Sequence, residues 1–473
     1  MVHLLQVMER DDLHFTSASE AERIVERQRV FFRDGETLKI AFRKEQLRRL
    51  KAAVASRETA ILDALYADLR KSAFEAYSTE VGLVYREISH ALRRVSRWAR
   101  PQRVPTDLFN LPGRSRLYRE PYGVSLIIAP WNYPFQLLFV PLIGAIAAGN
   151  TVILKPSEYA PRTAAVVDRM IRDTFPEQYV AAVQGDAETA RALTQLPLDH
   201  IFYTGSRRIG SKVMAAAAEQ LTPVTLELGG KSPSIVDETA NLDLAARRII
   251  FGKSINAGQT CVAPDYLLVQ ESVHDALVER MTAVVGEFFG ESPATHPRYS
   301  RIVNERHFDR LVGMIDESKV YFGGDTDRED LYIAPTIMTD VALEHPVMQD
   351  EIFGPILPVL KVPSLDAAIE VIQRNPKPLA LYLFTRSREA ERKVVRSVAF
   401  GGGAVNATIM HVASLHLPFG GVGSSGMGRY HGKASFDCFT NEKGVLRQPS
   451  FFDHGLAYPN SRAGLGVLKR LLK

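Results

Sequence analysis

The sequence predicts an α/β protein with mostly parallel, doubly wound sheets, because short apolar segments alternate with helical patterns from about residue 123 onward. The first such segment, Val124–Ile128, is a nearly unbroken apolar run that ends before Pro130, which is typical of a strand buried on both faces. The chain has 473 residues, enough for roughly three structural units. Its apolar content of 46% and charged content of 24% exclude a disordered or fibrous chain.

The predicted elements follow the chain in a regular order. Residues 20–70 are helical in pattern, because their apolar side chains recur at spacings of three, four or seven: Leu47, Leu50, Val54, Ile61, Leu65 and Leu69. Further strands are predicted at residues 151–154, 179–183, 200–203, 224–228 and 266–270. Helices are predicted at residues 135–148, from about 161, and at 186–196, 208–219, 241–254 and 273–289. From about residue 401, glycine-rich turns predict a loop and hairpin region that closes back on the rest.

The charge pattern argues against a nucleic-acid partner. The 58 Lys and Arg residues exceed the 54 Asp and Glu residues by only four, and the two kinds are interleaved along the chain. The densest basic stretch, residues 43–51, lies on a helical pattern and is interpreted as a solvated helix face.

Cysteine usage and apolar runs predict a cytoplasmic protein. Two cysteines, Cys261 and Cys438, cannot form a disulfide framework, so a reducing compartment is expected. The first ten residues do not resemble a signal peptide, and no stretch approaches 18 consecutive apolar residues. No HExxH or CxxC is present and the histidines do not cluster, so no metal site is predicted.

One strand-to-helix turn is a candidate phosphate site. The apolar segment at 200–203 runs into a turn containing Gly205, Ser206 and Gly210, and a helical pattern starts directly after it. Glycines let backbone amides approach a phosphate, and a helix start attracts an anion, although such turns also carry these residues for geometric reasons. The literal GxGxxG at residues 421–426 follows no parallel strand and is assigned to tight turns.

Three side chains could carry chemistry. Cys261 stands among small polar neighbours on a loop, which permits the exposure that a nucleophile needs, whereas Cys438 between phenylalanines is interpreted as a small buried hydrophobe. Glu227 ends an apolar strand, where burial should raise its pKa toward that of a general base; the alternative is an ion pair with Lys231. Asn132 offers an amide donor at the carboxyl end of a strand, or simply forms a turn beside proline.

Taken together, these segments resemble the aldehyde dehydrogenase superfamily. The order APWNYPF, KPSE, FYTGS, LELGGKSP, NAGQTC, EIFGP and PFGGVG, from about residue 129 to 423, matches that family's landmark series. The segments ERQRVFFRDG, FEAYSTEVG and SGMGRYHGKASFDCFT are similar to the class 3 branch, which includes the fatty-aldehyde enzymes. The resemblance covers roughly residues 20 to 448.

The resemblance implies a set of roles. Cys261 would be the nucleophile, Glu227 the general base and Asn132 the oxyanion donor. The implied contacts to NAD or NADP come from seven residues: Lys155 and Glu158 for the adenosine ribose, Gly205, Ser206 and Gly210 for the pyrophosphate, and Glu351 and Phe353 for the nicotinamide ribose. Because acylating relatives often lack the glutamate, Glu227 favours hydrolysis to a free acid over transfer to coenzyme A. The substrate would be a medium- or long-chain aliphatic or an aromatic aldehyde.

The implied architecture has three parts and a tail. Residues 1–105 and 123–226 would form the cofactor domain, 227–405 the catalytic domain, and 106–122 with 406–450 the bridging region of a homodimer. The tail, 451–473, is apolar and basic but too short to span a bilayer. It could lie on a membrane surface, cover a substrate entrance or pack on a partner subunit. An N-terminal extension of about 18 residues receives no role.

Two other functions remain open from the sequence. One is a catalytically silent scaffold or binding protein that keeps the fold. The other is a thiol esterase that uses Cys261 without redox chemistry.

Overall fold

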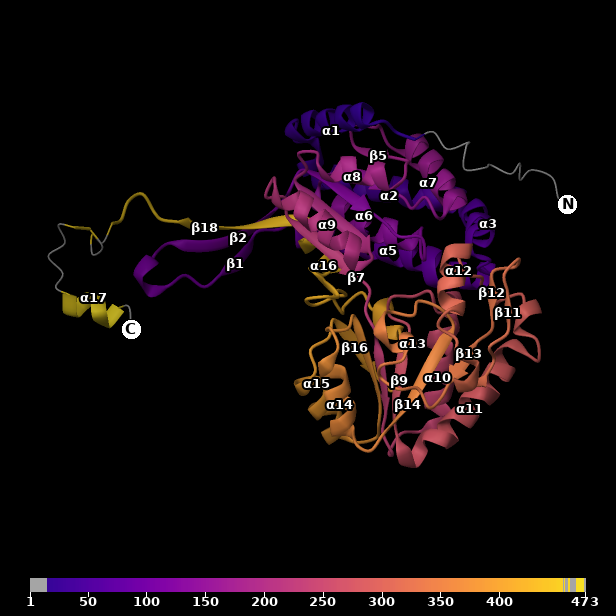
Figure 1. The fold of residues 1–473 in the computed structure, drawn as a ribbon. Coiled ribbons are helices and arrows are strands. Elements are labelled where there is room, and N and C mark those ends of the chain that lie inside the picture. The colour runs from indigo at the N-terminus through magenta and orange to yellow at the C-terminus, as the bar shows by residue number, and fades with distance from the viewer. Residues whose placement is uncertain (1–14, 454, 456–457, 460–464, 472–473) are drawn as a thin grey trace.

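The computed structural model describes residues 15–453, 455, 458–459 and 465–471. Most of the N-terminal extension lies outside this range, as do Leu472 and Lys473 of the tail. The described chain forms two large sheets flanked by helices, and a small antiparallel sheet that projects from them (Figure 1). The predicted α/β class is confirmed.

The first large sheet has six strands in the order β17-β7-β6-β3-β4-β5. All its pairs are parallel except β17 with β7. The bounds are β3 (Val124–Ile128), β4 (Thr151–Lys155), β5 (Val180–Ala182), β6 (His200–Gly205), β7 (Val224–Leu228) and β17 (Gly426–Met427). Every side chain of β3 is buried, which confirms the strand buried on both faces.

The second large sheet has seven strands in the order β10-β13-β14-β9-β8-β15-β16, all parallel except β10 with β13. The bounds are β8 (Pro233–Val236), β9 (Tyr266–Gln270), β10 (Val320–Phe322), β13 (Thr336–Met338), β14 (Ile356–Val362), β15 (Ala380–Phe384) and β16 (Gly402–Val405). Two short strands, β11 (Thr326–Asp327) and β12 (Tyr332–Ile333), pair separately.

The small sheet is antiparallel, in the order β1-β2-β18. Its strands are β1 (Gln102–Val104), β2 (Arg114–Pro121) and β18 (Thr440–Arg447), and Figure 1 shows it as an arm directed away from both large sheets. β1 lies within the segment that the sequence assigns to the cofactor domain. The division of the chain into domains stays a prediction.

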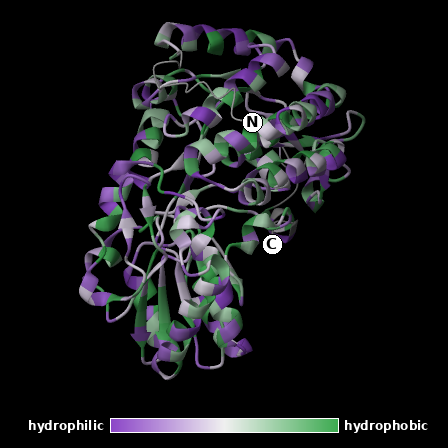
Figure 2. Ribbon diagram, turned by 90° about the vertical axis from the view of Figure 1, so that its right-hand side faces the viewer, coloured by the Kyte–Doolittle hydropathy of each residue, from purple (hydrophilic) through white to green (hydrophobic). Residues whose placement is uncertain are grey.

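Helices cover both large sheets, and Figure 2 shows apolar strands in the lower sheet with mixed polar and apolar residues on the helices around them. This is the pattern expected when helices shield a parallel sheet from water. The helices are α1 (Ala18–Arg33), α2 (Ile40–Ser56), α3 (Glu58–Leu69), α4 (Ala73–Ala76), α5 (Gly82–Trp98), α6 (Gln136–Ala148), α7 (Pro161–Thr174), α8 (Ala187–Thr194), α9 (Arg207–Ala218), α10 (Leu242–Ser254), α11 (Glu271–Phe289), α12 (Glu305–Val312), α13 (Pro346–Gln349), α14 (Leu365–Arg374), α15 (Arg388–Ser397), α16 (Lys433–Cys438) and α17 (Leu465–Leu471).

Short helical turns link these elements. A π-helical turn, η3 (Tyr77–Val81), joins α4 to α5. The 3₁₀ turns are η2 (Glu36–Leu38), η4 (Leu108–Asn110), η5 (Ile255–Gly258), η6 (Pro293–Thr295), η7 (Glu317–Lys319) and η8 (Met410–Ala413). No helix among the described residues is long and apolar enough to cross a bilayer.

One of the two interpretations of the N-terminal segment needs correction. The helical pattern at 20–70 is confirmed and is divided among three helices, because Gly35 adopts a left-handed conformation (φ 74°) and the chain turns again at Arg57. The basic stretch is not wholly a solvated face. Arg43 is buried and donates to the carbonyl oxygens of Thr37 (2.8 Å) and Ala147 (3.2 Å), whereas Arg48 is exposed as predicted.

Candidate active site

Cys261 follows a loop whose backbone is held in an uncommon conformation. Asn256, Ala257 and Gly258 have φ values of 52°, 50° and 73°, in the left-handed region that side chains disfavour. A Cβ atom on Gly258 would lie 2.2 Å from the carbonyl oxygen of Gly354, so glycine is required there. The loop leaves Cys261 half-buried, which fits the prediction of a reachable thiol.

Cys261 lines a cavity of about 620 Å³. The cavity is walled mainly by apolar side chains, among them Phe74, Leu137, Phe251, Phe288, Met410 and Phe419. Phe74 and Met410 are 66% and 58% exposed, so they lie toward the solvent side of this cavity. The cavity thus connects solvent to the thiol along an apolar wall.

Asn132 lies in the loop between β3 and α6 and is almost fully buried. Its side-chain nitrogen Nδ2 donates to the carbonyl oxygen of Gln259 at 3.0 Å. The neighbouring Tyr133 hydroxyl lies 2.6 Å from the Thr260 hydroxyl. Two side chains of this loop therefore contact the two residues that precede Cys261, and the predicted donor and nucleophile are brought together.

Glu227 lies on β7 and is 3% exposed. Neither carboxyl oxygen has a hydrogen-bond partner among the described residues. Burial raises the pKa of Glu227 well above its usual range, and nearby Arg429 opposes the shift. The alternative ion pair is wrong, because the Lys231 ammonium bonds instead to the Asp265 carboxylate at 2.6 Å.

The region predicted to form tight turns passes next to Glu227. Gly426, at the end of the GxGxxG segment, pairs with Glu227 in the antiparallel β17–β7 ladder. The backbone N–H of Val422 donates to the Ser425 hydroxyl at 2.9 Å within this turn. The assignment of the segment to turns is confirmed.

Two carboxyl groups influence the thiol. Burial raises the pKa of Cys261, and the charges of Glu351 and Glu227 raise it further. Both glutamates are therefore near enough for their charges to act on the thiol. Because a raised thiol pKa disfavours the reactive thiolate, this arrangement needs a proton acceptor or a positive charge beside Cys261 before the thiol can react.

Lys155 and Glu158 lie at the carboxyl end of β4. The Lys155 ammonium is 2.7 Å from the Glu158 carboxylate, and both side chains are largely shielded from solvent. Burial lowers the pKa of Lys155, while Glu158 raises it. The two residues therefore form an ion pair, and their predicted contact with the adenosine ribose stays a prediction.

Gly205, Ser206 and Gly210 lie where β6 passes into α9. Ser206 is the N-cap of α9, and its side chain accepts from the Ile209 N–H at 3.4 Å. A Cβ atom on Gly210 would lie 2.6 Å from Leu228, so glycine lets α9 approach β7 closely. The turn presents a helix N-terminus at the same edge of the sheet as Lys155, because β3 pairs in parallel with both β4 and β6.

Glu351 and Phe353 lie on the segment between α13 and β14. One carboxyl oxygen of Glu351, Oε1, is buried without a partner among the described residues. Burial, followed by the charge of Asp265, raises the pKa of Glu351 to about 8. Phe353 packs edge-on against Trp131 at 5.3 Å between ring centroids, so it lies next to the Asn132 loop.

Sequence reasoning missed a buried charge cluster behind the site. Lys71, Glu75 and Glu80 contact the backbone of both the Asn132 loop and the Cys261 loop. The FEAYSTEVG segment, residues 74–82, contains both glutamates. Charged residues inside a segment that packs on an apolar helix are the signal that could have identified them. No group of three or more His, Cys, Asp or Glu side chains in the described part of the chain could hold a metal ion.

Comparisons with known proteins identify the family of this chain. The model of the aldehyde dehydrogenase family matches residues 11–445. The chain is 49% identical over 447 residues to the 4,4'-diaponeurosporen-aldehyde dehydrogenase of Staphylococcus aureus, covering 94% of this chain and 97% of that one. It is 44% identical to the mouse protein named aldehyde dehydrogenase, dimeric NADP-preferring, covering 90% and 94%. Further relatives are named as family 3 members.

A solved structure shows the same fold. The structure described as the substrate-bound state of Staphylococcus aureus AldH has a TM-score of 0.94 and 48% identity, covering 96% of this chain and 99% of that one. The chain therefore belongs to the aldehyde dehydrogenase family. The predictions of the class 3 branch and of an NAD(P)-dependent enzyme are confirmed.

Proposed function

We propose that this enzyme oxidises an apolar aldehyde to the carboxylic acid through a covalent adduct on Cys261, with NAD or NADP as cofactor. The observation that carries the proposal is the apolar cavity that reaches Cys261, with Glu227 buried and unpartnered among the described residues close by. A silent scaffold has no physical need for an unpartnered buried carboxyl, because such a group destabilises the fold.

The first step is attack by sulfur. The Cys261 thiol first loses its proton to water in the cavity, and the thiolate then adds to the aldehyde carbon, forming a C–S bond and an alkoxide on the carbonyl oxygen. The Asn132 amide uses one N–H on the carbonyl of Gln259 and has a second available for the alkoxide. Removing such a donor typically costs about 10²–10³ in rate.

The residues along the sheet edge fit a nicotinamide dinucleotide. Lys155 and Glu158 would hold the adenosine ribose, and the amides at Gly205, Ser206 and Gly210 would face the pyrophosphate at the start of α9. The unpartnered Glu351 Oε1 suits a ribose hydroxyl, and Phe353 would support the adjoining ring. When bound, the cofactor supplies the acceptor for the aldehyde hydride, and this leaves a thioester on Cys261.

Glu227 completes the reaction. Its carboxylate takes a proton from water, the resulting hydroxide attacks the thioester carbonyl, and the C–S bond breaks to release the acid and regenerate Cys261. Burial raises the pKa of Glu227 well above the usual carboxyl range, which makes its carboxylate a stronger base toward water than an exposed one. This role favours the free acid as product.

The cavity lining indicates the substrate class. Its mainly apolar wall suits an aliphatic or aromatic chain, and the staphylococcal relative is named a 4,4'-diaponeurosporen-aldehyde dehydrogenase. The test is formation of reduced cofactor with straight-chain aldehydes of increasing length, using NAD and NADP in turn. We expect kcat/KM to rise by about fourfold per methylene until the cavity is filled, which corresponds to ~0.8 kcal/mol for each buried group. An esterase would show no reduced cofactor, and a scaffold no turnover with aldehydes or esters.

We also propose that the enzyme is a homodimer, as the name of the mouse relative states for that protein. The projecting sheet leaves β18 as an edge strand, and most of its residues are exposed. Unpaired strand edges of this kind favour pairing with a second chain. Light scattering coupled to gel filtration should give twice the chain mass; a monomer mass at micromolar concentration would contradict the proposal.

A weak membrane-surface contact through the tail is a further proposal. In α17, Leu465 and Val467 are exposed beside Lys469 and Arg470, an amphipathic composition suited to an anionic surface. Full-length protein should co-sediment with anionic vesicles more than a chain ending at residue 460. Equal partitioning would overturn the contact.

A further inference from the structure

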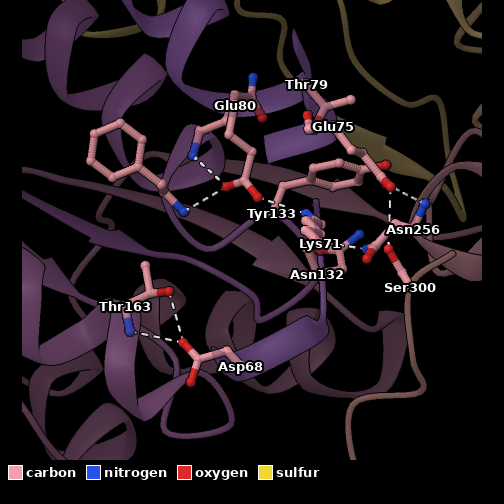
Figure 3. Close-up of polar contacts among 12 residues, drawn as sticks. Asp68, Lys71, Glu75, Thr79, Glu80, Asn132, Tyr133, Thr163, Asn256 and Ser300 are labelled. Atoms are coloured by element: carbon pink, nitrogen blue, oxygen red, sulfur yellow. Dashed lines mark hydrogen bonds and ion pairs between the residues drawn. The ribbon is translucent and has the colours of Figure 1, made fainter. Parts of the chain in front are cut away.

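A cluster of buried charges joins two loops. One is the Asn132 loop between β3 and α6, here called the oxyanion loop, and the other is the loop that leads from Asn256 to Cys261. The cluster lies on one continuous stretch, from the end of α3 through α4 and η3, that sequence motifs assign to neither loop. Figure 3 shows Glu80 on one side of the cluster, Lys71 beside Asn132 at its centre, and Glu75 reaching toward Asn256 and Ser300 on the other side. Lys71 and Glu80 are completely buried, and their ammonium and carboxylate are 2.6 Å apart.

The ion pair holds the Asn132 loop by its backbone. Lys71 Nζ donates to the carbonyl oxygen of Asn132 at 2.7 Å and lies 3.9 Å from the centre of the Tyr133 ring. Glu80 Oε2 accepts from the N–H groups of Phe135 (2.9 Å) and Gln136 (3.1 Å), at the first turn of α6. The cation therefore bonds to the middle of the loop, and the anion bonds to its C-terminal end, where α6 begins.

Glu75 holds the other loop. Its carboxylate accepts from the Asn256 N–H at 2.6 Å and from the Ser300 hydroxyl at 3.2 Å. Asn256 is one of the residues with left-handed backbone, so this bond supports a conformation that is otherwise unfavourable. The Asn256 side chain in turn donates to the carbonyl of Asn132 at 2.8 Å, the same oxygen that Lys71 contacts.

We infer that Lys71 and Glu80 are positioning residues, which fix the Asn132 amide relative to Cys261 through the backbone of the oxyanion loop. The inference rests on the proposed role of Asn132. Neither residue lines the cavity or contacts Cys261, so their effect passes through Asn132. A misplacement of about 1 Å at a reacting group can cost about 10²-fold in rate, so a small shift of this loop has a measurable effect.

The test is a double-mutant cycle between Lys71→Met and Asn132→Ala, measured as kcat and KM for an apolar aldehyde. Lys71→Met alone should lower kcat about tenfold to a hundredfold with little change in KM. In the Asn132→Ala background it should lower kcat by less than about threefold, because the donor that it positions is already absent. Lys71→Arg, which keeps charge and donors, should recover part of the lost rate.

The outcomes separate the inference from the proposed function. If Asn132→Ala leaves kcat unchanged, the oxyanion role and this inference both fail. If Asn132→Ala lowers kcat and Lys71→Met costs the same factor in both backgrounds, only the positioning role fails, because a general structural effect is additive.

A matched control lies on the same stretch of chain. Asp68 accepts from the Arg162 and Thr163 N–H groups at 3.0 and 2.8 Å, at the start of α7 and away from Asn132 (Figure 3). Asp68→Asn should lower the melting temperature, and any effect on kcat should be additive with Asn132→Ala. Should Lys71→Met not fold, Glu80→Gln replaces it in the same cycle with the same expectations; an additive result there overturns the inference.

Discussion

Two groups of buried carboxylates lie around the Asn132 and Cys261 loops, and they differ in how they are bonded. Glu75 and Glu80 each accept two hydrogen bonds, and Glu80 also pairs with Lys71. Glu227 accepts none among the described residues, and Glu351 keeps one oxygen unpartnered. Burial of an unpartnered polar group costs free energy, so fully bonded groups stabilise a geometry while unpartnered ones remain available to a substrate, water or cofactor.

The two cysteines differ in a similar way, because Cys261 lines the cavity whereas Cys438 contacts Thr225. Substitution of Cys261 should have the largest effect on activity. Cys261→Ala should abolish formation of both acid and reduced cofactor, because no other described thiol lines the cavity. Cys438 lies at the end of α16 with its sulfur 3.0 Å from the Thr225 hydroxyl, so Cys438→Ala should keep near-normal turnover. Equal loss in the two variants, measured by absorbance of the reduced cofactor, would contradict the assignment of the nucleophile.

Glu227→Gln should separate the two halves of the reaction. The variant should release one equivalent of reduced cofactor rapidly and then turn over about 10²–10⁴ times more slowly, because the thioester lacks its base. Rapid-mixing measurements of reduced cofactor give both phases. Turnover at the wild-type rate would show that another group activates water.

The wild-type pH profile gives an independent test of Glu227. A base acts only when deprotonated, and burial raises its pKa, so the acidic limb of kcat should lie above the usual carboxyl range of about 4. This limb should disappear in Glu227→Gln. A limb at the ordinary carboxyl pKa would contradict the environment described for Glu227.

Asn132→Ala should have the next smaller effect. Loss of the amide donor should lower kcat by about 10²–10³ with little change in KM, since the interaction strengthens only when charge develops on the substrate oxygen. Steady-state kinetics with a single aldehyde are sufficient. A change confined to KM would instead indicate a role in ground-state binding.

The sequence predicts the fold and the candidate site residues better than it predicts the buried contacts that hold those residues in place. Short apolar strands and landmark motifs identify β3, β7 and Cys261, because the information lies within a few neighbouring residues. The contact from Lys71 to Asn132 spans 61 residues, and neither position shows its partner locally. Likewise, the pairing of Lys231 with Asp265 rather than with Glu227 depends on how two strands of one sheet and a distant loop meet, which spacing alone does not determine.

The smallest expected effect is on thermal stability. Substitution of Glu227 and substitution of Glu80 should change the melting temperature in opposite directions. The raised pKa of Glu227 means that the folded state binds its proton more tightly than the unfolded chain does, so this contribution to stability is complete at low pH. It is lost as pH rises from about 4.3 through the raised pKa, by up to about 1.4 kcal/mol per pH unit. Glu227→Gln has no such loss, so the melting temperature of this variant should rise relative to that of the wild type as pH increases across this range.

Glu80→Gln should instead lower the melting temperature at neutral pH, because it leaves the buried Lys71 ammonium without its counter-charge. Thermal unfolding of the three proteins at several pH values decides between these signs, and a destabilised Glu227→Gln would mean that this carboxyl is bonded as fully as Glu80.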